Sequence, residues 1–229
     1  MRCLVKVNGL RVCYGDYEAV KGVSFSLVER EILGIVGESG SGKSTIAKTL
    51  IGLEKPSGGT IAVGAKSMQM VFQDAVGSLN PRLTVRSALT ETLRLKRSKR
   101  TAAELLERVG LSEAVLNQYP RELSGGQCQR ISVARALACE PEVLIADEPV
   151  SALDVSVQAR VLNLLRDLRD ELGLSIILIA HDLAVVRNVC DRICVMEKGR
   201  FVDAGDADEV FSNPTSDYTR RLLTAVPRI

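Results

Sequence analysis

Residues 37–44 have the sequence GESGSGKS, which matches the pattern G-x-x-x-x-G-K-S/T of a loop that wraps nucleotide phosphates. Gly37, Gly40 and Gly42 let the backbone turn so that its N–H groups point inward. Lys43 is placed to reach the β- and γ-phosphates and the Ser44 hydroxyl to hold Mg²⁺. A chance glycine-rich turn is the alternative. The apolar stretch before this phosphate loop and the helical stretch after it favour phosphate binding.

Two adjacent carboxylates, Asp147 and Glu148, follow the apolar run 143–146. Open α/β sheets bind ligands at the carboxyl ends of their strands, so we expect both acids near the phosphate loop. Asp147 would hold Mg²⁺ directly or through water, and Glu148 would polarise a water for attack on the γ-phosphate. A solvated acidic turn is the alternative interpretation, and the phosphate loop upstream argues against it.

Single polar residues end two further apolar runs. His181, the only histidine of the chain, follows residues 175–180, and Gln73 follows residues 68–72. A lone histidine is usually a packed or surface residue, but at the end of a core strand it would contact the γ-phosphate or the attacking water. The neutral amide of Gln73 can bind both Mg²⁺ and water.

A second glycine-rich segment, LSGGQCQR at residues 123–130, precedes another helical pattern. The first turn of that helix offers free backbone N–H groups to a phosphate, as the phosphate loop does. Two anion-binding helix starts in one chain of 229 residues therefore need an explanation that a phosphate loop alone does not supply.

Segments of strand and helix character alternate along the chain and position these residues. We expect strands over residues 4–12, 20–27, 31–36, 60–63, 68–72, 143–146, 175–180, 193–196 and 200–204, and helices over 43–53, 131–138, 155–172, 183–189 and 218–225. Residues 85–119 are helical and charged and indicate a separate helical unit. Strands that alternate with helices indicate a mostly parallel α/β core.

The composition is that of an ordinary globular chain, with 46% hydrophobic residues, 25% charged residues and a net charge of +2. This balance gives no sign of a polyanion partner, although it does not exclude nucleic acid. No apolar run approaches the roughly 18–20 residues of a membrane span, and the first residues lack the apolar core of a signal peptide. We therefore expect a cytosolic protein. The basic block 94–100 lacks interleaved aromatics and is interpreted as a solvated helix end or loop rather than a nucleic-acid patch.

The six cysteines include no C-x-x-C pair. Cys190 and Cys194 lie four residues apart, a spacing that can share one helix face. We interpret the six as small buried apolar residues in a reducing compartment, with a metal site or a disulfide as the alternative.

Together these motifs resemble those of ATP-binding cassette (ABC) ATPases over nearly the whole chain. Residues 37–44 resemble the family's Walker A loop, residues 143–147 its Walker B strand, and the unaltered LSGGQ at 123–127 its signature. Gln73 is similar to the Q-loop glutamine, Glu148 to the catalytic glutamate, residues 151–154 to the D-loop and His181 to the switch histidine.

The resemblance implies an α/β fold of the P-loop NTPase type with a mostly parallel core sheet and a small antiparallel β-subdomain. We expect one domain over 1–229, in which 1–84 and 139–229 form the core with the β-subdomain and 85–138 form an inserted helical subdomain. The segment between Lys43 and Gln73 is shorter than in typical members of the family. We therefore expect that part of the antiparallel β-subdomain is missing.

The resemblance also implies a set of site residues. The catalytic residues would be Lys43, Gln73, Glu148 and His181, the Mg²⁺ ligands Ser44, Gln73 and Asp147, and the D-loop dimer contacts Ser151 and Asp154. The ATP contacts would be Tyr14, Gly37, Ser39, Gly40, Gly42, Lys43, Ser44, Thr45, Ser124, Gly125, Gly126 and Gln127. Tyr14 stands where the family stacks an aromatic on adenine; Tyr17 is the alternative, and either ring could be merely packed.

In the mechanism that the resemblance implies, two cassettes form a head-to-tail dimer around two ATP molecules. Each ATP binds one chain's Walker A loop and is completed by the other chain's signature, so that Ser124 and the N–H groups of Gly125 and Gly126 contact the γ-phosphate. Hydrolysis removes this bridge and lets the dimer open.

Details of the motifs narrow the resemblance to the peptide/nickel importer ATPases. FQD at 72–74 with SLNPR at 78–82 is similar to that group, and SGGQCQR at 124–130 resembles the F-type ATP-binding subunit of oligopeptide and dipeptide importers. The tail 213–227 is similar as well, whereas Ala75 stands where the group usually has proline.

This narrower resemblance implies an ATPase that powers uptake of peptides, or of nickel and similar chelates, from the cytoplasmic face of the inner or plasma membrane. Its implied partners are two transmembrane permease subunits, a second ABC ATPase subunit and, indirectly, an extracytoplasmic solute-binding protein; no nucleic acid is expected. One alternative is a soluble ABC ATPase acting on nucleic acid, against which the near-neutral charge argues. A non-catalytic regulatory cassette is another alternative, and the presence of Glu148 and His181 argues against it.

Overall fold

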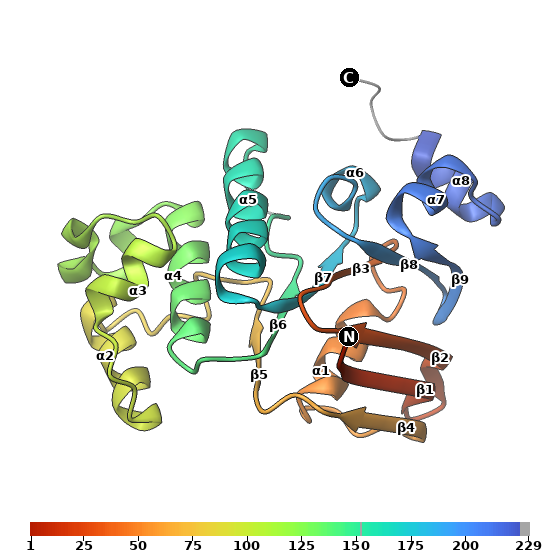
Figure 1. Cartoon of the computed structure of the whole chain (residues 1–229), viewed down its shortest axis with the longest axis horizontal. Helices are drawn as coiled ribbons and strands as arrows, with labels where there is room; N and C mark the ends of the chain where they lie inside the picture. Colours follow the sequence, from red (N-terminus) through yellow and green to blue (C-terminus); the bar gives the residue numbers. More distant parts are fainter. Residues whose placement is uncertain (152, 225–229) are drawn as a thin grey trace.

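The computed structural model describes residues 1–151 and 153–224. Figure 1 shows its two sheets and the helices around them. The strands are β1 (Cys3–Tyr14), β2 (Tyr17–Val28), β3 (Ile32–Val36), β4 (Gly58–Val63), β5 (Met68–Val71), β6 (Val143–Asp147), β7 (Ser175–Ala180), β8 (Arg192–Glu197) and β9 (Arg200–Asp206). The helices are α1 (Lys43–Leu50), α2 (Val85–Lys96), α3 (Ala102–Arg108), α4 (Gly125–Leu137), α5 (Val155–Leu172), α6 (Leu183–Val186), α7 (Ala207–Ser212) and α8 (Asp217–Thr224), with 3₁₀ turns η1 (Glu113–Asn117) and η2 (Pro120–Glu122).

The larger sheet has six strands in the order β5-β6-β7-β3-β8-β9. Every neighbouring pair is parallel except β8 and β9, which confirms the predicted mostly parallel core. The strands β3, β6 and β7 are buried at every residue. A parallel sheet is covered on both faces, which is why these strands appear in the sequence as unbroken apolar runs.

The two faces of this sheet pack against different elements because successive side chains of a strand point to opposite sides. On β7, Ile176 and Leu178 join the cluster that includes α4 and α5. Ile177 and Ile179 join a second cluster with α1 and the antiparallel sheet. The sheet is therefore a rigid platform whose carboxyl edge is held in place from both faces.

The smaller sheet is antiparallel, with the order β2-β1-β4. The hairpin between β1 and β2 closes at the pair Tyr14 and Tyr17, and its tip carries Gly15 in the left-handed region with φ 58°. This small sheet lies beside α1 at the lower right of Figure 1.

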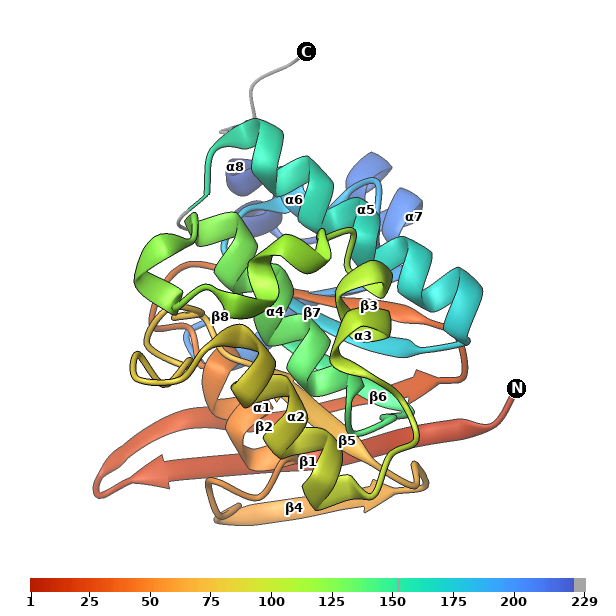
Figure 2. The same ribbon diagram turned by 90° about the vertical axis from the view of Figure 1, so that its left-hand side faces the viewer.

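The helices α2, α3 and α4 lie together at the left of Figure 1 and face the viewer in Figure 2. Leu89, Leu105, Leu116 and Ile131 are fully buried among them. Thr101 begins α3 with a capping box, in which its hydroxyl accepts from the Glu104 N–H and the Glu104 carboxylate accepts from the Thr101 N–H. Among residues 1–151 and 153–224, no helix combines the length and apolar character of a membrane span.

Several elements differ from the sequence-based expectation. The helix α7 was not predicted; its six residues are too few for a periodic pattern, and it begins where Asp206 accepts from the Asp208 N–H. The helix α4 begins at Gly125, six residues before the predicted start, because Ser124 caps it. The predicted end of the last helix at residue 225 lies outside the described residues.

The cysteines only partly follow the prediction. Cys128, Cys190 and Cys194 are buried, whereas Cys3 and Cys13 are exposed on the outer face of β1, so the interpretation as buried apolar residues is wrong for these two. Cys190 precedes β8 and Cys194 lies within it, so the two do not share a helix face.

Candidate active site

The phosphate loop joins β3 to α1, and its glycines are required by close backbone contacts. A Cβ atom on Gly37 would lie 2.1 Å from the Met196 carbonyl oxygen, and one on Gly42 would lie 2.5 Å from the Ala19 carbonyl oxygen. Gly42 also has φ 110°, a conformation that other residues rarely adopt. The loop therefore keeps its shape only with glycine at these two positions. Ser39 and Gly40 are exposed on it, and Thr45 is half-buried in the first turn of α1.

Lys43 begins α1 and is 3% exposed. Its ammonium group donates to the Gly37 carbonyl at 2.7 Å and to the Glu38 carbonyl at 2.9 Å, and it lies 3.6 Å from Glu148 Oε1. Burial lowers the pKa of Lys43, and the nearby Glu148 carboxylate acts in the opposite direction. The loop thus curls around its own lysine, and two of its carbonyls hold the ammonium group in place.

Asp147 ends β6, and its buried carboxylate accepts a hydrogen bond from Ser44 Oγ at 2.9 Å. Burial raises the pKa of Asp147, while the Ser44 hydrogen bond lowers it in part. Two residues that are far apart in sequence therefore present oxygen atoms side by side, as the strand-end argument predicted.

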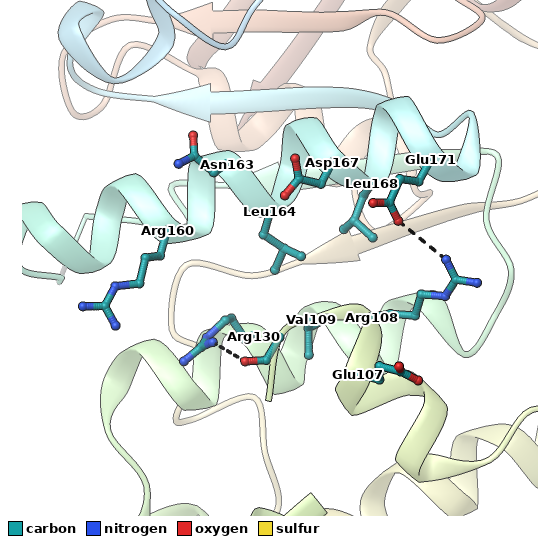
Figure 3. A pocket seen from close by; sticks show the side chains of 11 residues that line it. Glu107, Arg108, Val109, Arg130, Arg160, Asn163, Leu164, Asp167, Leu168 and Glu171 are labelled. Carbon is teal, nitrogen blue, oxygen red and sulfur yellow. Dashed lines mark hydrogen bonds and ion pairs between the residues drawn. The ribbon is translucent and has the colours of Figure 1, made fainter. Parts of the chain in front are cut away.

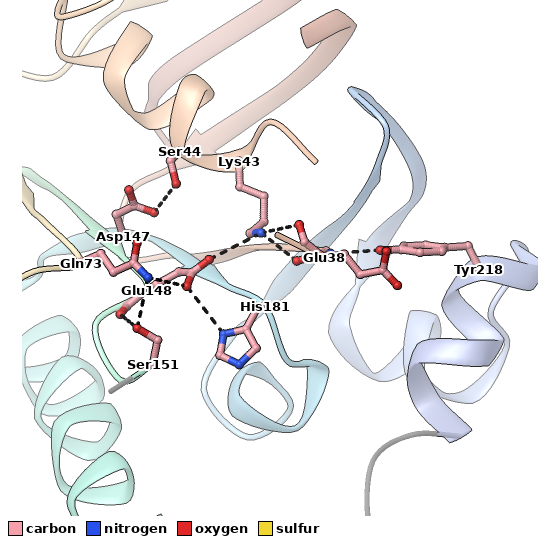
Figure 4. Close-up of polar contacts among 10 residues, drawn as sticks. Glu38, Lys43, Ser44, Gln73, Asp147, Glu148, Ser151, His181 and Tyr218 are labelled. Carbon is pink, nitrogen blue, oxygen red and sulfur yellow. Dashed lines mark hydrogen bonds and ion pairs between the residues drawn. The ribbon is translucent and has the colours of Figure 1, made fainter. Parts of the chain in front are cut away.

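Glu148 is the centre of a group of polar side chains at the carboxyl edge of the sheet (Figure 4). Gln73 Nε2 donates to Glu148 Oε2 at 3.1 Å, and His181 Nδ1 lies 3.7 Å from the same oxygen. Glu148 itself has φ 46°, an uncommon conformation outside glycine, and its N–H donates to the Ile179 carbonyl at 3.0 Å. Its backbone is thus held against β7, which aims the carboxylate at Lys43.

The oxygen atoms near the phosphate loop suit Mg²⁺, which binds proteins through one or two carboxylates and keeps water and phosphate oxygens as its other ligands. Asp147 supplies one carboxylate and Ser44 a hydroxyl, and the Gln73 side chain, whose Nε2 contacts Glu148, also carries an amide oxygen. Within the described residues, no three His, Cys, Asp or Glu side chains form a metal cluster. A site completed by substrate phosphates is therefore the arrangement that these residues fit.

The signature segment, residues 123–127, begins α4. Ser124 Oγ accepts from the Gln127 N–H at 3.3 Å, and Gln127 Oε1 accepts from the Ser124 N–H at 2.8 Å. Gly126 packs on α5, since a Cβ atom there would lie 2.4 Å from Val157 Cγ1. In the described part of the chain, no hydrogen bond or ion pair joins this segment to the phosphate loop.

The remaining predicted residues lie on the β1–β2 hairpin and in the segment that follows Glu148. Tyr14 and Tyr17 are 43% and 59% exposed at the hairpin tip, so neither ring is packed in the core. Ser151 Oγ donates to the Glu148 carbonyl at 3.1 Å, and Asp154 is exposed just before α5. Residue 152, within the predicted D-loop, lies outside the described residues.

Two hydrogen bonds that support the phosphate loop could not be predicted from the sequence. The Gly199 N–H donates to the Ser41 carbonyl at 2.9 Å, and the Glu38 N–H donates to the Tyr218 hydroxyl at 3.0 Å. Both supports come from the last part of the chain, and no local sequence pattern links either of them to the loop.

A separate hollow of about 580 Å³ lies between α5 and the helices α3 and α4 (Figure 3). Arg108 and Glu171 form an ion pair across it at 3.7 Å, and Arg130 donates to the Gly110 and Gly126 carbonyls. None of its lining residues belongs to the phosphate loop. Its lining residues instead come from α3 and the turn after it, from α4, which begins with the signature segment, and from α5.

Known proteins resemble this chain in both sequence and fold. Residues 20–151 match the family model described as "ABC transporter". The chain is 50% identical to the oligopeptide transport ATP-binding protein OppF of Escherichia coli over 92% of this chain and 70% of that protein. It is 48% identical to the oligopeptide transport ATP-binding protein AppF of Bacillus subtilis, over 93% of this chain and 71% of that one. The solved dimeric post-hydrolysis structure of the ATP-binding cassette MJ0796 bound to ADP and Pi aligns with a TM-score of 0.78 at 30% identity, covering 89% of this chain and 99% of that one.

Proposed function

The chain belongs to the ABC transporter family and is an ATPase, and from this premise we propose that it powers the uptake of peptides. The observation that carries the choice of peptides is the identity of about half of the aligned residues to oligopeptide transport ATP-binding proteins of Escherichia coli and Bacillus subtilis. Nickel or other chelates remain the alternative solute that the motifs allow. Nothing in the comparisons supports the nucleic-acid alternative.

In the proposed mechanism, Lys43 binds the β- and γ-phosphates of ATP. Its ammonium group already faces the loop interior, and phosphate oxygens would take over the place of the two loop carbonyls that it now contacts. The N–H groups at the start of α1 form the positive end of the helix dipole, which would further stabilise the bound phosphates. The side chains of Ser44, Asp147 and Gln73 would hold Mg²⁺, which neutralises phosphate charge when it is bound.

Glu148 would act as the general base. It would take a proton from the attacking water onto a carboxylate oxygen, while Gln73 and His181, which flank that carboxylate, would orient the water and the γ-phosphate. Tyr14, or alternatively Tyr17, would stack on adenine, because both rings are exposed and free to receive a base.

A second cassette would complete each site. Ser124 and Gln127 use their N–H groups in the capping box of α4, whereas the N–H groups of Gly125 and Gly126 have no acceptor among the described residues. These two N–H groups, with the Ser124 hydroxyl, would bind a γ-phosphate held by a partner. The D-loop residues Ser151 and Asp154 would then lie at the dimer contact. The partner cassette can be a second copy or a related chain.

We further propose that residues 85–138 act as one helical subdomain and that residues 73–82 with this subdomain contact two membrane subunits from the cytoplasmic face. Phe72, just before this segment, and Val76, within it, are exposed apolar side chains that a partner would cover. A solute-binding protein outside the membrane would act on the ATPase only through those subunits.

The test is to purify the tagged full chain from its native membranes in mild detergent and to identify its partners by mass spectrometry. Two multi-span proteins and a second cassette should co-purify. ATP turnover of that complex in liposomes should then rise when its binding protein is loaded with a peptide and not when it is offered a nickel chelate. Recovery with nucleic acid from the soluble fraction would contradict the proposal.

A further inference from the structure

Tyr218, on the last helix of the described chain, contacts the phosphate loop. Its hydroxyl accepts a hydrogen bond from the Glu38 N–H at 3.0 Å, although the two residues are 180 positions apart (Figure 4). The tyrosine is only 5% exposed, so its ring is packed and its hydroxyl has a defined position. Burial raises the pKa of Tyr218, which keeps the hydroxyl neutral.

Glu38 is held from both sides by this contact and by the loop lysine. Its N–H donates to Tyr218, and its carbonyl accepts from Lys43 Nζ at 2.9 Å. The peptide groups on either side of Glu38 are therefore fixed by one residue inside the loop and one residue outside it. The orientation of the Lys43 ammonium group depends in turn on where the Glu38 carbonyl lies.

The helix that carries Tyr218 is itself anchored on the core. The buried carboxylate of Asp203, on β9, accepts from the backbone N–H and the hydroxyl of Thr215 and from the Ser216 N–H at 3.0 Å. Ser216 Oγ then accepts from the Tyr218 N–H at 3.1 Å. This chain of contacts runs from β9 through the start of α8 to the tyrosine, so docking of α8 determines where the Tyr218 hydroxyl lies.

We propose that Tyr218 is a positioning residue of the phosphate loop, through which the docking of α8 sets the affinity for nucleotide. The proposal rests on the assignment of residues 37–44 as the ATP site. A loop that is held in its binding shape before the ligand arrives binds more tightly, because the affinity falls in proportion to the fraction of chains in that shape. Tyr218 does not touch the reacting atoms in this account; it acts through Glu38.

The test is the full chain carrying Tyr218→Phe, which keeps the ring and removes only the acceptor. The Kd for ATP and for ADP should rise about three- to tenfold, as expected for the loss of one hydrogen bond. In the transporter complex, KM for ATP should rise by a similar factor while kcat at saturating ATP stays unchanged. Amide hydrogen exchange at Glu38, followed by NMR, should accelerate. Tyr119→Phe is the matched control, since no hydrogen bond uses the Tyr119 hydroxyl in the described part of the chain.

A double-mutant cycle with Asp203→Asn tests the anchoring. If α8 acts through Tyr218, the double variant should raise the Kd for ATP by less than the product of the two fold increases seen for Asp203→Asn and Tyr218→Phe alone. A folded Tyr218→Phe chain with parent Kd and parent Glu38 exchange would overturn the inference, and so would a lowered kcat with an unchanged KM. Lys43→Ala separates this failure from failure of the ATP site, because that variant must lose nucleotide binding whatever Tyr218 does.

Discussion

Lys43 Nζ lies 3.6 Å from Glu148 Oε1, so the cation of the phosphate loop faces the acid that follows β6. The lysine is buried, and the glutamate is held by its backbone against β7. A γ-phosphate bound by Lys43 would lie beside the Glu148 carboxylate. A general base must be in that position to take a proton from a water that attacks the phosphate. In the proposed mechanism, the contact between these two residues would join phosphate binding and hydrolysis in one site.

Lys43→Ala should remove tight nucleotide binding. The variant loses a cation that charge-assisted hydrogen bonds would join to two phosphates, each worth about 1.5–3 kcal/mol, so the Kd for ATP should rise at least about tenfold. Titration with a fluorescent ATP analogue measures it. Lys55→Ala, at an exposed turn, is the matched control and should bind as the parent does. Normal turnover by Lys43→Ala would rule out the assignment of the phosphate loop.

Gly37→Ala should distort the phosphate loop, because the added Cβ atom would meet the Met196 carbonyl oxygen at 2.1 Å. Overpacking of this kind costs about 1–3 kcal/mol in the free energy of unfolding, and ATP affinity should fall with it. Urea unfolding and ATP titration measure the two effects. Gly205→Ala is the control, since its Cβ atom would make only ordinary contacts at 3.5 Å. Equal stability of both variants would contradict the geometry described for the loop.

Ser124→Arg should leave nucleotide binding to the single chain intact and damage turnover only in the assembled complex. Among the described residues, no hydrogen bond or ion pair joins the signature segment to the phosphate loop of its own chain, so a bulky cation there should leave ATP bound by the same chain undisturbed. The substitution also removes the Ser124 cap, which weakens α4 by about 0.5–2 kcal/mol but does not reach the phosphate loop. ATP titration of the isolated chain and phosphate release by the complex measure the two steps. Ser57→Arg, at an exposed turn, is the control. A fully active Ser124→Arg complex would argue against a site shared between two cassettes.

The docking of α8 should weaken in acid. Burial alone would raise the pKa of Asp203, but the hydrogen bonds from Thr215 and Ser216 outweigh it and leave that pKa below its ordinary value of about 3.9. Since the folded pKa is the lower one, ionised Asp203 stabilises the fold above about pH 4, and this contribution disappears as the pH falls through the folded pKa.

Urea unfolding of the parent and of Asp203→Asn measures this effect. The difference between their free energies of unfolding should be present at neutral pH and shrink as the pH is lowered below about 4. The exposed Asp167 supplies the control variant Asp167→Asn, for which we expect little difference at any pH. A difference that stays constant or grows in acid would show that the Asp203 carboxylate does not anchor α8 by its charge.

Much of the fold could be predicted from the sequence, because the patterns that specify its strands and helices lie within single segments of the chain. The apolar runs of β3, β6 and β7 mark buried parallel strands, and the amphipathic pattern of α5 gave both of its ends, Val155 and Leu172. The convergence of Lys43 and Asp147 also followed from local information, since both lie at the carboxyl edge of one sheet.

Other features depend on contacts between distant segments and could not be predicted. The hydrogen bond from Glu38 to Tyr218 requires that β9 and α8 place one hydroxyl beside one N–H, and neither segment carries a pattern that specifies this. The short helix α7 depends on the cap at Asp206 more than on periodicity. The proposed contact of the signature segment with a phosphate is still less local, because it would involve a second chain.

The most direct test of the central claim is ATP hydrolysis and ATP retention by Glu148→Gln in the assembled transporter. The amide keeps the shape of the side chain and removes the base, so the Kd for ATP should stay near that of the parent while phosphate release falls about 10²–10⁴-fold. The complex should then hold ATP in a closed dimer. Glu209→Gln, at an exposed position of α7 outside the proposed sites, is the control and should hydrolyse ATP as the parent does. Hydrolysis by Glu148→Gln at the parent rate would contradict the account.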